Sequence, residues 1–307
     1  MGSLWMLVAA LLFSVMSACV KLASAHFSIA EIVLYRGLTG VVLVALLVRQ
    51  QRGTLRTPHV KDHLWRGAVG VLSLWLWFYG ISKLPLATAV TLNYMSPIWM
   101  AAFLFCAGWW HAKDHVAWPL VVAILCSFVG VTLVLQPAFE AKQWVGALTT
   151  LGSGLFSAAA YLQVRKLSQL GEPEYRVVFF FSCVNLAAGL AGSATTVFDP
   201  AVVTFHPLDW YSGGLLLLMG TCATLAQLAM TRAYAVGNTL VVANLQYTGI
   251  IFSSIWSMLL WGDRFGWHVW LGMAIIFGSG LAVTYYNTRS TARGTAVEKT
   301  DPIASET

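Results

Sequence analysis

The chain consists of two similar halves, and this repeat constrains its fold more than any other feature. The matching positions are Phe13-Ser14 with Phe156-Ser157, Glu31 with Glu174, Leu92-Asn93-Tyr94 with Leu245-Gln246-Tyr247, and Gly130 with Gly280. A repeat with an odd number of membrane spans must place its second copy upside down in the bilayer. Such inverted repeats are typical of membrane transporters.

The composition places the chain in a membrane. Of its 307 residues, 58% are hydrophobic and 10% are charged, whereas soluble domains carry about 25% charged residues. Apolar segments of about 20 residues, long enough to cross a bilayer, recur throughout. We therefore predict an all-α integral membrane protein with ten transmembrane helices, arranged as two inverted five-helix repeats. The expected spans are 3–22, 31–48, 66–83, 86–107, 116–136, 144–164, 176–197, 211–231, 239–261 and 267–286.

The placement of the 18 Lys and Arg residues predicts the orientation. In the ten-span arrangement three lie on one side (Lys83, Lys142 and Arg264) and two fall within spans (Lys21 and Arg36). The other side holds Arg49, Arg52, Arg56, Lys61, Arg66, Lys113, Arg165, Lys166, Arg176, Arg232, Arg289, Arg293 and Lys299. The positive-inside rule places this rich side, with both termini, in the cytoplasm. The net charge of +6 is thus explained by topology, and no nucleic-acid partner is expected.

The expected organisation follows from these spans. Residues 1–136 form the first repeat, 137–143 a short polar linker, 144–286 the second, inverted repeat, and 287–307 a disordered cytoplasmic tail. The first span lacks the basic segment that opens a secretory signal and has a repeat partner at 144–164, so we expect a retained helix.

Polar side chains on two equivalent spans predict a shared central cavity. A polar group within a span must face protein or water, and the repeat sets Thr91 against Asn244 and Tyr94 against Tyr247. Gln227, on the eighth span, joins this set as a substrate-binding candidate. The alternative is that these groups only form hydrogen bonds between helices, which are worth about 0.6 kcal/mol each in membranes.

Two cations within spans could attract an anionic substrate group. Arg36 lies several residues into the second span, and Lys21 ends a polar stripe on the first. An intramembrane cation costs at least about 2.5 kcal/mol unless it is paired or hydrated. The alternative for Arg36 is snorkelling to the headgroups or pairing with Glu31.

The third and fourth spans add aromatic residues and a proline. Trp75 and Tyr79, one turn apart in mid-span, are candidates to pack a planar or apolar part of the substrate. Pro97 removes a backbone hydrogen bond and should kink the fourth span, and in a carrier such a kink can serve as a gate.

Chemistry other than transport has little support in the sequence. His111 and His115 have the spacing of metal ligands, but no accompanying acid completes a metal motif. The five scattered cysteines argue against a disulfide framework. We therefore expect no catalytic residues, cofactor or metal. Because no carboxylate lies in the middle of a span, a facilitator or exchanger is favoured over proton coupling, although Lys21 or Glu31 could still titrate.

The run from Ser82 to Pro97, with sequence SKLPLATAVTLNYMSP, resembles the core of EamA-type carriers of the drug/metabolite transporter superfamily. Glu31 to Arg36 and Gly262-Asp263 are similar to family positions too, and the resemblance covers about residues 3–286. It departs at Trp109-Trp110, where the family usually shows Gly-Glu, and at Gly249-Ile250, where a Pro is common. These departures put in doubt any gating that needs symmetric prolines.

The resemblance implies a multi-pass carrier of the bacterial inner membrane, with the bilayer and a small-molecule substrate as its partners and no obligate protein partner. It also implies export of amino acids or related metabolites by alternating access. An uptake carrier for a planar, vitamin-like compound is the first alternative, encouraged by the aromatic residues. An integral-membrane acyltransferase is the remote one.

Overall fold

A computed structural model describes residues 4–110, 122, 125–126, 129–130, 132–134, 143–195, 205–237, 242–243, 245–279, 281–282 and 285. The expected linker at 137–142, the tail from 287, His111 and His115, Asn244 and most of the span expected at 116–136 lie outside these residues.

The described part of the chain is helical and contains no strand. The first half supplies α1 (Trp5–Ala23), α2 (Ile29–Gln50), α3 (Val60–Lys83), α4 (Leu86–Asn93) and α5 (Ser96–Trp110). The second half supplies α7 (Trp144–Gln169), α8 (Glu174–Thr195), α9 (Trp210–Val236) and α11 (Thr248–Trp261), and a further helix covers Trp267–Ser279. The helices α1, α2, α3, α7, α8 and α9 are each long and apolar enough to cross a membrane.

Local sequence sets where two of these helices begin. Ser28 precedes α2, and its side chain accepts a hydrogen bond from the Glu31 backbone while the Glu31 carboxylate accepts one from the Ser28 backbone. Asp209 and Ser212 form the same reciprocal arrangement before α9. This pairing satisfies backbone donors that a helix start leaves free, so both helices have a defined first turn next to a loop.

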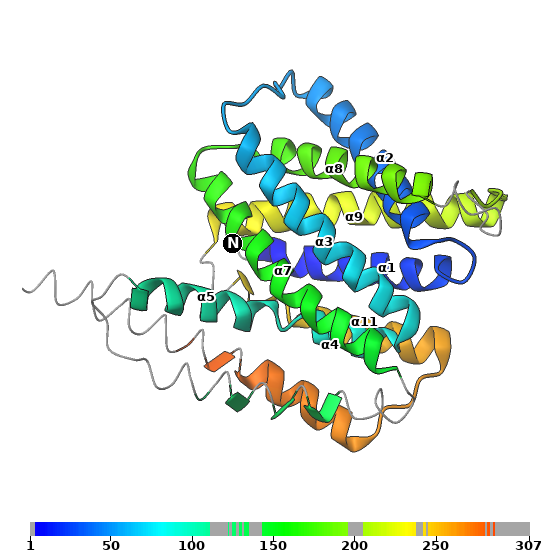
Figure 1. Cartoon of the computed structure of the whole chain (residues 1–307), viewed down its shortest axis with the longest axis vertical. Coiled ribbons are helices and arrows are strands. Elements are labelled where there is room, and N and C mark those ends of the chain that lie inside the picture. Colours follow the sequence, from blue (N-terminus) through cyan, green and yellow to red (C-terminus); the bar gives the residue numbers. More distant parts are fainter. Residues whose placement is uncertain are drawn as a thin grey trace, which may run out of the picture.

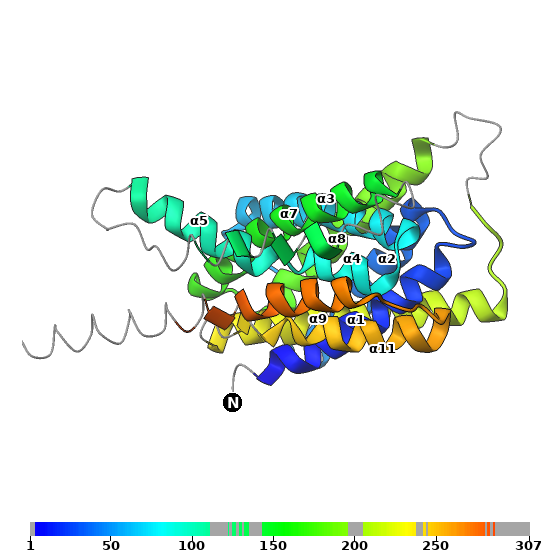
Figure 2. The same ribbon diagram turned by 90° about the horizontal axis from the view of Figure 1, so that it is seen from below.

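The two halves pack against each other helix by helix. In Figures 1 and 2, α1 lies beside α9, and the corresponding pair α7 and α3 lie side by side. Between the two second helices, α2 and α8, the backbones approach closely at two glycines. A Cβ atom on Gly37 would lie 2.4 Å from the Leu186 nitrogen, and one on Gly189 would lie 2.5 Å from the Leu34 nitrogen. Small residues permit this close contact between membrane helices.

The fourth helix of the first half is interrupted rather than merely kinked. The span expected at 86–107 consists of α4 and α5, separated by Tyr94 and Met95. Pro97 has no N–H to donate to the Asn93 carbonyl, and the Met95 N–H bonds to Leu92, three residues back. The second half has the same interruption at Gln246 and Tyr247, just before α11, although no proline is present there.

The third span also differs from its predicted bounds. Helix α3 begins at Val60 rather than 66, because the charged residues after Val60 continue the helix instead of forming a loop. This places Arg66 six residues inside a helix with its side chain buried, rather than at the start of the helix next to a basic loop.

Candidate substrate-binding site

A small cavity lies between the two halves. Its volume is about 40 Å³, room for a few water molecules. It is lined by residues of α1, α2, α3, α7, α8 and α9 together with Tyr94, and these residues are Phe13, Met16, Arg36, Arg66, Gly70, Ser73, Leu74, Trp77, Tyr94, Ser157, Ala160, Tyr161, Phe181 and Gln227. Both halves therefore contribute residues to one site.

Two buried arginines dominate the chemistry of this cavity. Arg36 is 4% exposed and Arg66 is 2% exposed. Their guanidinium carbons lie 5.0 Å and 3.6 Å from the centre of the Phe181 ring, so the two carbons are no farther apart than the sum of these distances. Arg66 donates a 2.9 Å hydrogen bond to Gln227. No Asp or Glu is among the described residues that line the cavity.

The two arginines reach this site from opposite ends of the bundle. Arg36 lies seven residues after the start of α2 and Arg66 six residues after the start of α3, which is about 10 Å along each helix. The two helices run in opposite directions, so the long side chains converge from both ends on Phe181. Several donors there have no partner among the described residues: Nε of Arg36, and Nε and Nη1 of Arg66.

Neutral polar groups form a hydrogen-bond network beside the cavity, and Ser73, Ser157 and Tyr161 of this network line it. The Ser73 and Ser157 hydroxyls lie 2.7 Å apart, and Asn93 donates to both Ser153 (2.7 Å) and Ser157 (3.3 Å). These bonds join α3, α4 and α7. Gln246, the repeat equivalent of Asn93, donates a 3.1 Å hydrogen bond to the Tyr161 hydroxyl. The polar residue at each helix interruption thus bonds to α7.

Of the residues proposed from the sequence, three line the cavity: Arg36, Tyr94 and Gln227. Thr91 is buried and donates to the Ala87 carbonyl of its own helix. Tyr247 does not line the cavity; it is buried, and its ring packs edge-on against the ring of Phe277. Asn244 lies outside the described residues.

The other proposed residues lie elsewhere. Trp75 packs against α8, where its ring fills the space beside Gly192, and Tyr79 faces Lys83, whose nitrogen lies 6.0 Å from the ring centre. Lys21 lies 3.9 Å from Asp263 and 4.6 Å from the centre of the Trp261 ring. Pro97 occupies the second position of α5, next to the interruption.

Several cavity residues were missed in the sequence: Arg66, Trp77, Ser157, Tyr161 and Phe181. A signal for some of them was present. Arg66, Gly70, Ser73 and Trp77 are spaced so that they share one face of a helix, and a span starting at Val60 would have placed that face inside the membrane.

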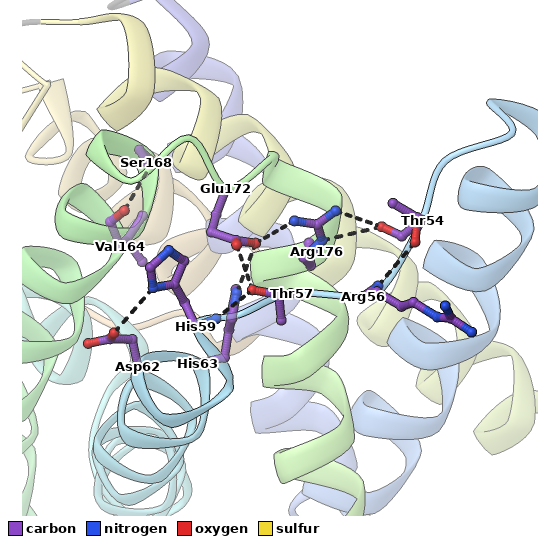
Figure 3. A network of polar contacts seen from close by, with 10 residues as sticks. All are labelled: Thr54, Arg56, Thr57, His59, Asp62, His63, Val164, Ser168, Glu172 and Arg176. Carbon is purple, nitrogen blue, oxygen red and sulfur yellow. Dashed lines mark hydrogen bonds and ion pairs between the residues drawn. The ribbon is translucent and has the colours of Figure 1, made fainter.

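Networks between the two halves close both ends of the bundle. We call the end where α2 meets α3 and α7 meets α8 the basic end. There, the buried Glu172 carboxylate accepts hydrogen bonds from Thr57 (2.5 Å) and Arg176 (2.8 Å) and lies 3.1 Å from His63 (Figure 3). Burial alone would raise the pKa of Glu172, but these hydrogen bonds outweigh it and hold the pKa below its usual range.

At the opposite end the roles of the halves are reversed: the glutamate belongs to the first half and the histidine to the second. Glu31 of the first half accepts a 2.7 Å hydrogen bond from the His206 backbone, and its carboxylate lies 2.9 Å from the His206 ring. The Lys21 and Asp263 pair crosses between the halves at this end as well. Each end therefore has a Glu–His contact that joins one half to the other.

Comparison with known proteins gives this arrangement a context. Residues 1–136 match the EamA-like transporter family. The chain is 34% identical over 262 residues to the pseudopaline exporter CntI of Pseudomonas aeruginosa, covering 85% of this chain and 88% of that protein. It is 27% identical to the riboflavin transporter of Vibrio cholerae, over 95% of each chain. A crystal structure with 17% sequence identity, covering 94% of this chain and 98% of its own, matches with a TM-score of 0.66 and shows the likeness of fold alone.

Proposed function

The chain belongs to the EamA-like transporter family of multi-pass bacterial membrane proteins, and we propose that it exports amino acids or related small metabolites by alternating access. The observation that carries this proposal is the cavity between the halves, which is lined by charged and polar groups that include unpartnered arginine donors. A group so costly to bury is a functional candidate by default in a membrane.

We also propose the ten-helix, inverted-repeat arrangement predicted from the sequence. Two features support it. The first helix of each half contacts the third helix of the other half, as α1 with α9 and α7 with α3. The fourth helix of each half is also interrupted at the equivalent tyrosine, Tyr94 or Tyr247. Interrupted helices at the contact between repeats are a recurring feature of carrier binding sites.

In this proposal the two halves rock against each other about the cavity. The Glu172–His63 and Glu31–His206 contacts sit at opposite ends and both join the halves. Opening one end requires that end's contact to separate while the other holds. The cavity between these two contacts is then the place where the substrate binds as either end opens. We place the basic end and both termini in the cytoplasm of a bacterial inner-membrane protein.

Export is the proposed direction, supported by the relative named as an exporter. Uptake of a planar, vitamin-like compound is the second candidate. It is favoured by the Trp77 and Phe181 rings in the cavity and by the relative named as a riboflavin transporter. Flat aromatic surfaces in a binding site suit planar ligands.

The test is efflux from liposomes that contain the purified chain and a mixed pool of bacterial metabolites, followed by mass spectrometry with and without a pH gradient. We expect selective loss of a few compounds from these vesicles, and no such loss with Tyr94→Ala. Absence of selective flux from vesicles holding folded protein, in either direction, would reject the carrier proposal. Accumulation inside the vesicles of riboflavin-like compounds that were supplied outside would instead favour uptake.

A further inference from the structure

The two cavity arginines have no acidic partner among the residues that the structure describes, and this charge imbalance identifies a class of ligand. Resting on the proposed carrier function, we infer that the substrate is a small dicarboxylate, whose two carboxylates are bound by Arg36 and Arg66. This narrows the proposed substrates to the related metabolites that carry two carboxylates, and it makes Arg66 a specificity-determining residue that discriminates these diacids from neutral compounds and zwitterionic amino acids.

The first step is the cost of leaving these cations unpaired. An arginine in the middle of a membrane helix costs about 2.5–3.5 kcal/mol even on the lowest scales, and buried charges are normally paired. Arg36 and Arg66 are both more than nine-tenths buried. Arg66 has only the neutral Gln227 as a hydrogen-bond partner, and no hydrogen bond joins Arg36 to another described residue.

The carboxylates of the two end networks, Glu172 and Glu31, are not partners of the cavity arginines. Glu172 already accepts from Thr57 and Arg176 and contacts His63. Glu31 is held by the Ser28 and His206 backbones and by the His206 ring. Both carboxylates are therefore occupied in contacts of their own, which leaves the negative charge to come from the ligand.

Both arginines lie close to one aromatic ring. Their guanidinium carbons are 5.0 Å and 3.6 Å from the centre of the Phe181 ring, which attracts the positive charge but supplies no anionic partner. The unpartnered Nε of Arg36 and the unpartnered Nε and Nη1 of Arg66 are the donors that remain. A carboxylate presents two coplanar oxygens that can accept two parallel hydrogen bonds from one guanidinium group.

The rest of the lining decides between a diacid and an amino acid zwitterion. Tyr94, Tyr161, Ser157 and Gln227 offer only neutral hydrogen-bonding groups, and no described carboxylate is present to receive an ammonium group. A zwitterion would neutralise one arginine at most and bring a second unpaired cation. A dicarboxylate neutralises both arginines, so the site favours a net negative ligand.

The test measures binding and transport separately. In the first arm, the purified full chain in detergent is heated with succinate, with neutral succinamide, with butyrate or with inorganic phosphate, at equal ionic strength. Succinate should raise the unfolding temperature, and the other three should not. Arg36→Gln and Arg66→Gln should weaken the response by at least about 30-fold in apparent affinity. The exposed Arg232→Gln, which removes a surface arginine paired with Glu174, should respond like the unmodified protein.

Three results of the thermal-unfolding experiment would overturn the inference. The first is no stabilisation by succinate, and the second is an equal response to succinamide or butyrate. The third is a response to phosphate alone, which would point to a phosphate or lipid headgroup site. Retention of the full succinate response in both arginine variants would also overturn it. Monodisperse size-exclusion profiles show that the variants are folded, and Arg66→Lys, which keeps the charge, should restore part of the response.

In the second arm, the compounds that leave the metabolite-loaded vesicles are identified. We expect them to carry two carboxylates and to stay behind with Arg66→Gln. Selective efflux of neutral or zwitterionic compounds would reject the dicarboxylate assignment and leave the carrier function intact. No selective efflux, combined with succinate binding in the first arm, would reject the carrier function instead.

Discussion

The ring of Tyr94 occupies the space beside Gly249 that a larger residue would need. A Cβ atom placed on Gly249 would lie 2.5 Å from the Tyr94 hydroxyl oxygen and 2.6 Å from its Cε2 atom. Tyr94 belongs to the interruption of the fourth helix, and Gly249 is the second residue of α11, the helix that follows the equivalent interruption in the second half. The two halves are therefore in direct contact where each fourth helix breaks, at the edge of the cavity.

From this contact we predict that Gly249→Ala lowers transport. The added methyl group must displace the buried Tyr94 ring, which lines the cavity, and overpacking of this kind typically costs about 1–3 kcal/mol. Efflux from liposomes measures the effect. Gly213→Ala on α9 is the matched control, because a Cβ atom there meets nothing within 4 Å. Equal efflux by the two variants would show that transport does not depend on the position of the Tyr94 ring.

We predict that Arg36→Met stabilises the protein while it abolishes transport. Replacing a buried, unpaired cation with an apolar side chain of similar length removes a desolvation cost, and substitutions of buried charges by apolar residues gain about 1–4 kcal/mol. The unfolding temperature in detergent without added anions should rise, and efflux should fall. Arg232→Met, at an exposed position, should change both quantities little. A lower unfolding temperature for Arg36→Met would indicate that Arg36 has a structural partner.

The Glu172 network predicts a specific dependence of stability on pH. Because the pKa of Glu172 is lowered in the folded state, its contribution to the free energy of unfolding is complete above its unfolded value, about 4.3. That contribution is lost as the pH falls through the folded value. The stability difference between the unmodified protein and Glu172→Gln should thus be present near neutral pH and shrink as the pH falls below about 5. Thermal unfolding over this range measures it.

Glu174→Gln is the control for this pH series, because the Glu174–Arg232 pair is solvent-exposed and exposed pairs contribute little. The Glu172 change should be the larger one, about 1–3 kcal/mol, since it removes hydrogen bonds to a buried carboxylate. A difference that grows toward acidic pH would contradict the account of this network.

Close packing of α2 on α8 predicts a strong effect on folding at Gly37. A side chain there would run into the backbone of Leu186, which cannot move like the end of a flexible side chain. Gly37→Leu should reduce the yield of monodisperse protein from membranes. Gly152→Leu, where a Cβ atom meets nothing within 4 Å, should be tolerated, and similar yields for both would mean that the two helices separate easily.

Much of the architecture could be predicted from the sequence because apolar length and charge placement act along single helices. The six long apolar helices lie within the expected spans or extend them by a few residues. Arg36 was singled out because it lay well inside an apolar run. Arg66 was missed because Lys61, Asp62 and His63 made its segment look like a loop, and only packing against the other half shows that α3 continues through them.

The sequence could not show which aromatic side chains line the cavity. Trp75 and Trp77 are two positions apart on α3 and so point in very different directions. Trp77 faces the cavity, whereas Trp75 packs on α8. Which of them faces inward depends on the rotation of α3, and α7 and α8 set that rotation by packing against it. Likewise, Tyr94 and Tyr247 are equivalent in sequence, but only Tyr94 lines the cavity.

The most direct test of the account is the accessibility of Ser157, which lines the cavity, from the two sides of the membrane. In a chain whose native cysteines are replaced by Ala, Ser157→Cys is treated in oriented liposomes with a membrane-impermeant maleimide added to one side or the other. Alternating access predicts labelling from both sides, and no labelling of Ser253→Cys, which is fully buried outside the cavity. Labelling of Ser157→Cys from one side only, or from neither, would contradict a carrier that opens this cavity to each side in turn.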